Sequence, residues 1–216
     1  SWKPISTFPE KPFIMFTGLV EETGKIIDIQ ESGEGKRITL KAEKVVEDVS
    51  EGDSISVSGA CLTVESFSED SLSFFLAEET LEKTWFSEIE EGSKLNLERS
   101  LKAEDRMGGH HVQGHVEAVG KVLEVEELEE GWNMIFELPE KLQNHIVEKG
   151  FVTVEGISLT TTEVTENSFS ITVIPETWSV TNLSKKKEGD LVNLESDPIG
   201  RYVEKMVEGY LKRQEE

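Results

Sequence analysis

The 216-residue chain is predicted to be an all-β protein of two tandem copies of one small antiparallel domain, followed by a C-terminal helix. Three observations lead to this prediction. The sequence repeats itself after about a hundred residues, each copy holds about six short strand-like segments, and the last segment changes to a helical period. Short strands with a turn about every 8–12 residues are typical of a small barrel or sandwich, and both remain open at this point.

The repeat is visible without gaps over much of its length. Residues 112–122 restate residues 16–26 at an offset of 96, and residues 156–195 restate residues 59–98 at an offset of 97, with 15 of 40 positions identical. A period this long suits two complete small domains better than a solenoid. The expected division is a leader outside the repeat at 1–14, a first domain at 15–101, a second domain at 102–200 and a helix at 201–216.

The first copy contains segments of strand-like composition separated by turns. Residues 54–57, Ser-Ile-Ser-Val, alternate with period two, which is the pattern of a half-buried strand. Residues 31–36 and 51–53 are rich in Gly, Ser and Asp and are expected to be turns. A short crossing segment is expected at 84–89. The expected strand-like segments are 15–20, 25–29, 37–40, 54–57, 61–67, 72–76 and 94–98.

The second copy repeats this order. Its expected strands are 120–125, 132–137, 151–154, 158–164 and 169–174. Residues 139–147 are expected to form a single helix, because Pro139 suits a first helical turn. In the tail, apolar residues recur at helical spacing among charged ones: Val203, Met206, Val207, Tyr210 and Leu211. This amphipathic helix either packs on its own barrel or pairs with the same helix of another subunit.

Composition limits the partners of the chain. It holds 22 Lys and Arg against 44 Asp and Glu, a formal charge of −22 that repels nucleic acid. No apolar run approaches the roughly 18–20 residues of a membrane span. Cys61 is the only cysteine, which excludes an internal disulfide and fits a reducing compartment such as the cytoplasm. The proline-rich leader is either the remnant of a targeting peptide, for example to a plastid, or a sequence added for expression.

The informative positions are those where the two copies differ. His115 stands where the first copy has Leu19, and Lys149 stands where it has Gly52. The first copy instead carries Cys61 where the second has Ser158. Glu155 faces Ser58, and Asp197 faces Ser100. Two matched pockets of similar shape that carry different acid–base groups would suit two similar molecules bound in different roles.

Each of these residues also has a purely structural interpretation. A lone histidine beside glycine is often a satisfied structural group, Cys61 is often a small buried side chain, and Lys149 with Glu155 could form a surface ion pair. His110, His111 and His115 suggest a metal site, but adjacent histidines point to opposite faces of a strand and no second ligand cluster exists. No metal is therefore expected.

Several motifs closely resemble the riboflavin synthase family over residues 15–207. They are Met15-Phe-Thr-Gly-Leu-Val-Glu-Glu, Gly59-Ala-Cys-Leu-Thr-Val, Gly108-Gly-His-His-Val-Gln-Gly-His-Val, Lys149-Gly-Phe-Val-Thr-Val-Glu-Gly-Ile-Ser-Leu-Thr, Asn96-Leu-Glu-Arg and Asn193-Leu-Glu-Ser-Asp-Pro. The resemblance implies two six-stranded Greek-key barrels and a helix that gathers three subunits. It implies a cofactor-free transferase reaction in which two molecules of 6,7-dimethyl-8-ribityllumazine exchange a four-carbon unit and give riboflavin and 5-amino-6-ribitylamino-uracil.

The resemblance also implies the site. Each barrel would bind one lumazine, and the active site would form where the N-terminal barrel of one subunit of the homotrimer meets the C-terminal barrel of its neighbour. An association with lumazine synthase is a further expectation. The first pocket would comprise Gly18, Leu19, Val20, Cys61, Leu62, Thr63, Phe75, Leu76, Ala77, Glu78, Glu79 and Thr80. The second would comprise Gly114, His115, Val116, Lys149, Ser158, Leu159, Thr160, Thr172, Val173, Ile174, Pro175, Glu176 and Thr177.

The positions tied to activity in the family are Phe16, Ser54, Cys61, His115, Ser158 and Asp197. The chemistry removes a proton from the C7 methyl group of one lumazine and adds a nucleophile to C7 of the other. His115 and Thr160 are expected to support the methyl anion, and Ser54 or Cys61 to assist or position the nucleophile.

The chain departs from the family pattern in three places. Ser58 replaces the usual Asn and Glu155 the frequent Asp, and both changes are expected to alter ligand contacts. The leader precedes the Met-Phe at which the family usually starts. The alternative function is a non-catalytic, antenna-like lumazine- or flavin-binding protein.

Overall fold

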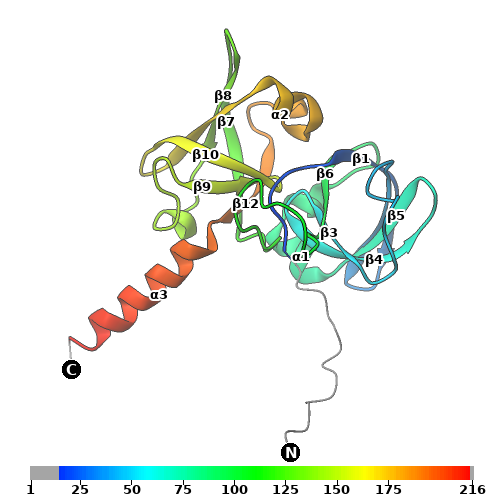
Figure 1. Ribbon diagram of the computed structural model, residues 1–216, viewed down its shortest axis with the longest axis horizontal. Helices are drawn as coiled ribbons and strands as arrows, with labels where there is room; N and C mark the ends of the chain where they lie inside the picture. The colour runs from blue at the N-terminus through cyan, green and yellow to red at the C-terminus, as the bar shows by residue number, and fades with distance from the viewer. Residues whose placement is uncertain (1–14, 215–216) are drawn as a thin grey trace, which may run out of the picture.

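The computed structural model describes residues 15–214 as two closed six-stranded antiparallel barrels that lie side by side, with one long helix beyond the second (Figure 1). The strand order is β1-β2-β5-β4-β3-β6 in the first barrel and β10-β11-β8-β7-β12-β9 in the second. The predicted fold class is confirmed, and the barrel is the correct choice over the sandwich. The predicted leader lies outside the described residues.

The first barrel is built from short, period-two strands. The elements are β1 (Glu22–Ser32), β2 (Gly35–Lys41), β3 (Ser54–Val57), β4 (Ala60–Phe67), β5 (Ser71–Leu76), the short helix α1 (Glu78–Lys83), the 3-10 helix η1 (Trp85–Glu88) and β6 (Lys94–Arg99). Leu72, Phe74 and Leu76 alternate along β5 and are fully buried, since every second side chain of a strand points inward.

The second barrel repeats this order. The elements are β7 (Ala118–Leu128), β8 (Gly131–Glu137), the 3-10 helix η2 (Glu140–Leu142), β9 (Phe151–Val154), β10 (Ile157–Val164), β11 (Ser168–Val173), the short helix α2 (Pro175–Val180), the 3-10 helix η3 (Asn182–Lys185), β12 (Leu191–Ser196) and the helix α3 (Pro198–Lys212). Each barrel encloses its own apolar core, and the rings of Phe136 and Phe169 stack at 5.3 Å in the second one.

Two predicted elements are wrong. Residues 139–147 form the 3-10 helix η2 and turns instead of one α-helix, because the segment is too short to repay nucleation and is held by the buried side chains of Leu142 and Ile146. Residues 15–20 form no strand. Phe16 pairs only with Val112, and Gly18 then leaves the extended conformation at a φ of +76°.

A buried polar network joins the barrels. The carboxylate of Glu155 accepts hydrogen bonds from Trp85 Nε1 at 2.7 Å and from Asn182 Nδ2 at 2.6 Å, and Lys186 Nζ lies 3.7 Å from it. Glu155 is fully buried and therefore does not form the surface ion pair with Lys149 considered from the sequence. Its desolvation is offset by these donors and by the nearby ammonium group.

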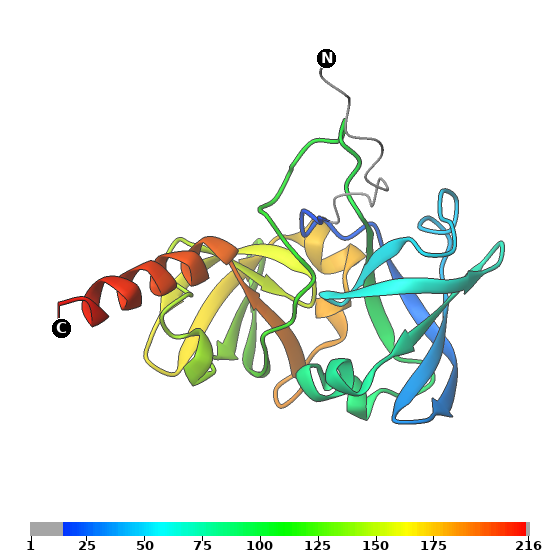
Figure 2. The ribbon, with the colours of Figure 1, turned by 90° about the horizontal axis from the view of Figure 1, so that it is seen from below.

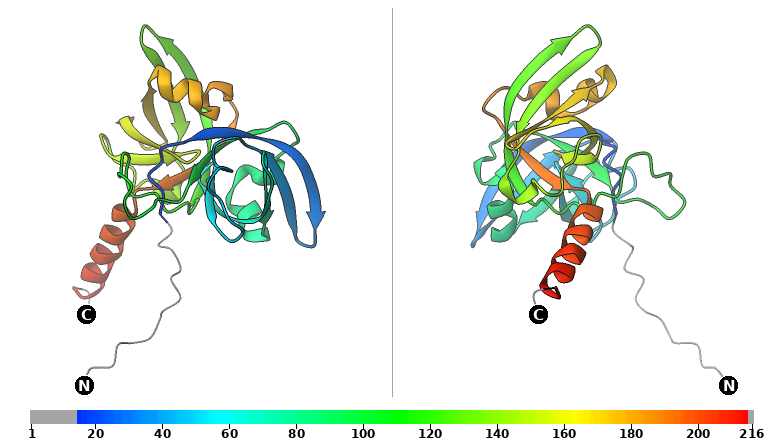
Figure 3. Two further views of the ribbon diagram at one scale, coloured as in Figure 1. Left: turned by 45° about the vertical axis from the view of Figure 1, so that its right-hand side comes forward. Right: turned by 90° about the vertical axis from the view of Figure 1, so that its left-hand side faces the viewer.

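The helix α3 stands away from both barrels for most of its length (Figures 2 and 3). It begins three residues before the predicted helix at 201–216, because Pro198 occupies the first turn and Asp197 Oδ1 accepts the Ile199 amide at 2.9 Å. The side chains of its apolar stripe are exposed, with Met206 at 74%. The first turns of the helix contact the second barrel through Glu204, which bonds Asn144 and His145, but most of the apolar stripe is not covered by the barrel. No helix in residues 15–214 has the length and apolar character to span a membrane.

Candidate ligand pockets

Two segments cross from one barrel to the other. The first strap, residues 16–20, precedes the first barrel, yet its Gly18 carbonyl accepts the amide of Ser158 of the second barrel at 2.9 Å. The second strap, residues 112–116, precedes the second barrel, yet its Gly114 carbonyl accepts the amide of Cys61 of the first at 2.8 Å. Each barrel therefore meets a segment that belongs in sequence to its neighbour.

The first pocket has a volume of about 300 Å³ and brings the thiol of Cys61 together with His115 of the second strap. Burial raises the pKa of the Cys61 thiol, a hydrogen bond with Ser54 opposes this, and the charge of Glu195 adds to the rise. Cys61 is therefore a neutral thiol at neutral pH. The pocket is lined by Ala60, Cys61, Ala77, Glu79, Thr80, Lys83, Thr84, Gly114, His115 and Val116.

The second pocket has nearly the same volume, about 310 Å³, and different chemistry. It is lined by Lys149, Ser158, Leu159, Thr160, Thr161, Thr162, Thr172, Ile174 and Thr177. Hydroxyl groups dominate, and Lys149 supplies the one ammonium group of this set. Lys149 has a φ of +60°, in the left-handed region that its counterpart Gly52 also adopts at +92°. The backbone geometry is thus conserved between the copies while the side chain is not.

The structure groups the strap residues differently from the expectation. The family resemblance implied Gly18, Leu19 and Val20 in the first pocket and Gly114, His115 and Val116 in the second. In the structure Gly114, His115 and Val116 line the first pocket, and Val116 packs against the first core. Val20 packs against the second core, and Gly18, Leu19 and Val20 line neither pocket. The repeat matches residues by their order along the chain and carries no information on this crossing.

Some predicted pocket residues do not line a pocket. Leu62 and Leu76 point into the first core and Val173 into the second, because neighbouring side chains on a strand point to opposite faces. Phe75 points outward beneath the guanidinium of Arg37, which lies 5.8 Å from its ring centroid. Thr63, Glu78, Pro175 and Glu176 also lie outside the two linings.

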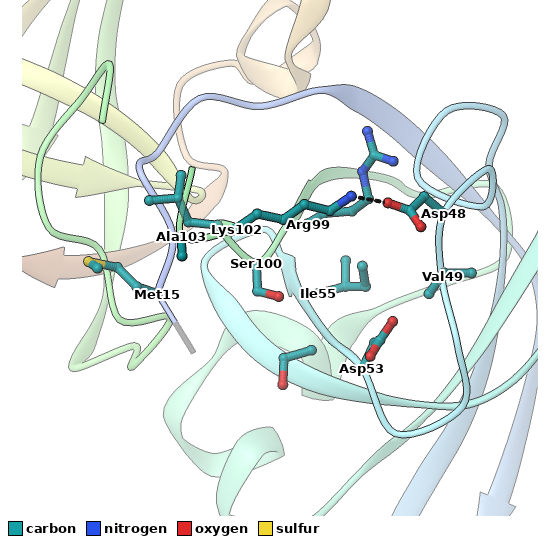
Figure 4. Close-up of a pocket in the computed structure, with 11 residues that line it drawn as sticks. Met15, Asp48, Val49, Asp53, Ile55, Arg99, Ser100, Lys102 and Ala103 are labelled. Carbon is teal, nitrogen blue, oxygen red and sulfur yellow. Dashed lines mark hydrogen bonds and ion pairs between the residues drawn. The ribbon is translucent and has the colours of Figure 1, made fainter. Parts of the chain in front are cut away.

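The remaining activity-linked residues lie around these pockets. Ser54 lines a separate cavity of about 580 Å³, in which Asp48 and Lys102 form an ion pair (Figure 4). The ring of Phe16 is fully buried between the barrels. Asp197 caps α3.

The cavity around Ser54 has a counterpart in the second barrel. At the offset of 97, Asp48 corresponds to His145, and His145 lines a cavity of about 630 Å³ beneath α3. His145 Nε2 contacts Glu204 Oε2 at 2.8 Å, where the first barrel has the ion pair of Asp48 with Lys102. These cavities therefore mark where each barrel holds the segment that follows its last strand.

His110 is a buried residue that the sequence-based site did not include. Its Nδ1 lies 2.7 Å from Ser158 Oγ, its Nε2 lies 3.2 Å from Thr153 Oγ1, and its ring stacks on Phe151 at 4.9 Å. Burial lowers its pKa, so the ring is neutral and orients the Ser158 hydroxyl. The histidine-rich stretch was the available signal. In residues 15–214, no three His, Cys, Asp or Glu side chains gather as metal ligands would.

Sequence and structure comparisons agree with this architecture. A family model described as the lumazine binding domain matches residues 17–100 and again residues 113–197. The chain is 43% identical to the riboflavin synthase of Actinobacillus pleuropneumoniae, over 89% of this chain and 90% of that protein. It is 40% identical to the riboflavin synthase of Schizosaccharomyces pombe, over 91% and 96%.

Solved structures of LumP are also similar. The complex with 6,7-dimethyl-8-(1'-D-ribityl) lumazine gives a TM-score of 0.77 at 26% identity, and the complex with riboflavin gives 0.78 at 28%, each covering 84% of this chain and 99% of LumP. Two barrels, each matched by the lumazine binding domain model, thus define a protein with paired lumazine-binding domains. With these relatives over most of its length, the chain belongs to the riboflavin synthase family.

Proposed function

We propose that the chain is a riboflavin synthase. It binds two molecules of 6,7-dimethyl-8-ribityllumazine, transfers a four-carbon unit from one to the other without a cofactor, and releases riboflavin and 5-amino-6-ribitylamino-uracil. The observation that carries the proposal is the pair of pockets of about 300 and 310 Å³ with unlike chemistry. One offers a thiol and an imidazole, and the other offers hydroxyls and an amine, which suits two copies of one substrate in two roles.

The pocket chemistry divides the roles. In the first pocket, His115 is exposed beside the protonated Cys61, so an imidazole is available to accept or return a proton. In the second, the Ser158 hydroxyl is held by the neutral ring of His110, and Thr160 and Lys149 lie in the same lining. Oriented hydroxyl and ammonium donors favour an electron-rich substrate at this second pocket.

The proposed active site lies between subunits of a homotrimer. The two pockets share no lining residue, so one chain binds its two ligands apart, whereas carbon transfer needs them in contact. The apolar stripe of α3 is exposed, with Ile199 at 67% and Met206 at 74%, and such a face is stabilised by pairing with other copies. Contact with lumazine synthase and a cytoplasmic or plastid location are part of the same proposal.

The alternative function is a non-catalytic lumazine or flavin carrier, as in the LumP complexes. The relatives named riboflavin synthase are 40–43% identical over about nine-tenths of the chain, whereas LumP is 26–28% identical. The chain also keeps Cys61, His115, Lys149 and Ser158 at the two pockets. Both observations favour the enzyme.

The test is conversion of the lumazine to riboflavin, followed by the absorbance of riboflavin. The wild-type protein should convert it, and His115→Gln should lower kcat by about 10²–10⁴-fold with little change in KM, as expected for a general acid–base group. Leu19→Gln, which puts the same side chain at the matched position of the other strap, is the control and should keep kcat within a few-fold. Binding without conversion by the wild type would favour the carrier.

A further inference from the structure

One buried carboxylate holds the whole turn of the second strap. Glu195 of β12 is 2% exposed, and its oxygens accept the amides of Gln113 at 2.8 Å, Gly114 at 2.9 Å and His115 at 3.0 Å. The carbonyl of Gly114 accepts the amide of Cys61. Glu195 therefore lies behind the turn that places His115 beside Cys61, without lining the pocket itself.

The first barrel contains the matched arrangement. Glu98 of β6 is 5% exposed and accepts the amide of Thr17 at 2.7 Å, its hydroxyl at 2.8 Å and the amide of Gly18 at 3.0 Å. The carbonyl of Gly18 in turn accepts the amide of Ser158. Each barrel thus uses one glutamate to hold the strap that its neighbour's pocket needs.

The charge on Glu195 is balanced mainly by backbone amides. Burial raises its pKa to about 7, and the amides of the strap and the charge of Arg201 on α3 oppose that rise. The other titratable groups near it are Cys61 on β4, whose pKa the Glu195 charge raises, and His115 on the strap. Three donors converge on the two oxygens, and the ionised form is the stronger acceptor for all of them.

We propose that Glu195 is a positioning residue for the reaction: its ionised carboxylate fixes the second strap so that His115 and Cys61 face the same ligand, and its protonation weakens the three amide hydrogen bonds that hold the strap. Glu98 does the same for the first strap at Ser158. This inference rests on the proposed function, but it predicts a property of Cys61 that requires no turnover.

The first experiment measures alkylation of Cys61 by iodoacetamide as a function of pH. Because the chain has one cysteine, the rate reports this thiol alone. Glu195→Gln removes a negative charge that raises the pKa of Cys61, so the midpoint should move to lower pH and Cys61 should react faster at pH 7 than in the wild type. Glu98→Gln is the matched control and should leave the midpoint unchanged. Equal profiles for all three proteins would overturn the proposal.

A second variant keeps the test decisive if Glu195→Gln fails to fold. Arg201→Met removes a cation that favours the ionised Glu195, so the inflection near pH 7 in the alkylation profile should move to higher pH. The Arg201 side chain is partly exposed and leaves both cores untouched. The role of Glu195 would be contradicted if the inflection in Arg201→Met stayed at the wild-type pH, or if the wild-type alkylation profile had no inflection near pH 7.

The second experiment is the pH dependence of kcat. In the wild type, kcat should rise as the pH increases through about 7. In Glu195→Gln this rise should be absent and kcat should be much lower, while KM changes little. A wild-type protein without synthase activity would refute the proposed function yet leave the alkylation test intact. If Glu195→Gln kept a normal kcat and the same rise of kcat through about pH 7, only the positioning role would be refuted.

Discussion

The contact between Gly114 and Cys61 can be tested by adding one methyl group. Gly114 has a φ of +75°, and a Cβ built there would lie 2.7 Å from Cys61 Cβ and 2.9 Å from Cys61 N. Alanine in this left-handed conformation costs roughly 1–2 kcal/mol. The clash is with backbone and cannot be relieved by a rotamer change, so the strap must move and lose the bond from the Cys61 amide, at about 0.5–1.5 kcal/mol.

We therefore expect Gly114→Ala to lower the free energy of unfolding by about 1.5–3.5 kcal/mol. At about 2–4 °C per kcal/mol for a chain of this size, the Tm should fall by roughly 3–14 °C. The control is Gly52→Ala. Gly52 also has a positive φ, +92°, but nothing lies within 4 Å of an added Cβ, and its counterpart Lys149 carries a side chain at φ +60°. Its cost should be the left-handed contribution alone, roughly 1–2 kcal/mol.

The assay combines thermal unfolding with conversion of lumazine to riboflavin in both variants. Gly114→Ala should lose activity at temperatures where it is still folded, because the displaced strap carries His115. Gly52→Ala should keep its activity. If the two variants unfolded at the same temperature and were equally active, the close approach of Gly114 to Cys61 would have no energetic weight and the pocket geometry argued from it would be wrong.

Two further predictions concern assembly and pH. Truncation before Tyr202 should give monomers with folded barrels and weak activity, since it removes most of the exposed apolar stripe of α3; sedimentation that still shows a trimer would contradict this. Glu98 and Glu195 have folded-state pKa values of about 7, above the usual 4.5 because of burial, so their stabilising contribution is complete below about pH 4.5 and is lost as pH rises to about 7. Each accounts for roughly 3 kcal/mol. The free energy of unfolding, measured by urea denaturation, should change less between pH 5 and 7 in the double variant Glu98→Gln/Glu195→Gln than in the wild type. The same pH dependence in both proteins would refute the assignment.

The strands were predictable because their signal is local. Alternation along residues such as Leu72, Phe74 and Leu76 follows from one buried face, and the internal repeat doubled the evidence for each strand. The short helices α1 and α2 were missed, since six residues with no buried side chain carry no helical period. The sequence marked their residues as part of a pocket but not as helical.

The crossing of the straps could not be predicted from the sequence. The repeat shows that Gly18 and Gly114 occupy matched positions. This match is found whether each strap stays with its own barrel or crosses to the other, so it does not distinguish the two arrangements. The choice depends on long-range contacts: the Ser158 amide for one strap and the Cys61 amide for the other. The consequence for function is large, because it moves His115 from the hydroxyl-rich pocket to the one that holds Cys61.

The difference between Ser58 and Glu155 has a structural cause. Neither residue lines either of the two ligand pockets. Ser58 and Glu155 lie where the two barrels approach each other closely. A Cβ added to Gly59 would lie 3.0 Å from the amide nitrogen of Gly156, and a Cβ added to Gly156 would lie 2.7 Å from the amide nitrogen of Gly59. Both side chains are fully buried beside this contact.

Two identical carboxylates at this contact would repel one another without water to screen them. One acidic and one neutral residue avoid this, and the single carboxylate is satisfied by Trp85, Asn182 and the ammonium group of Lys186. Divergence at Ser58 and Glu155 is thus required by near-symmetric packing. His115 and its counterpart Leu19 both face the solvent, so packing does not account for the imidazole that lines the first pocket beside Cys61.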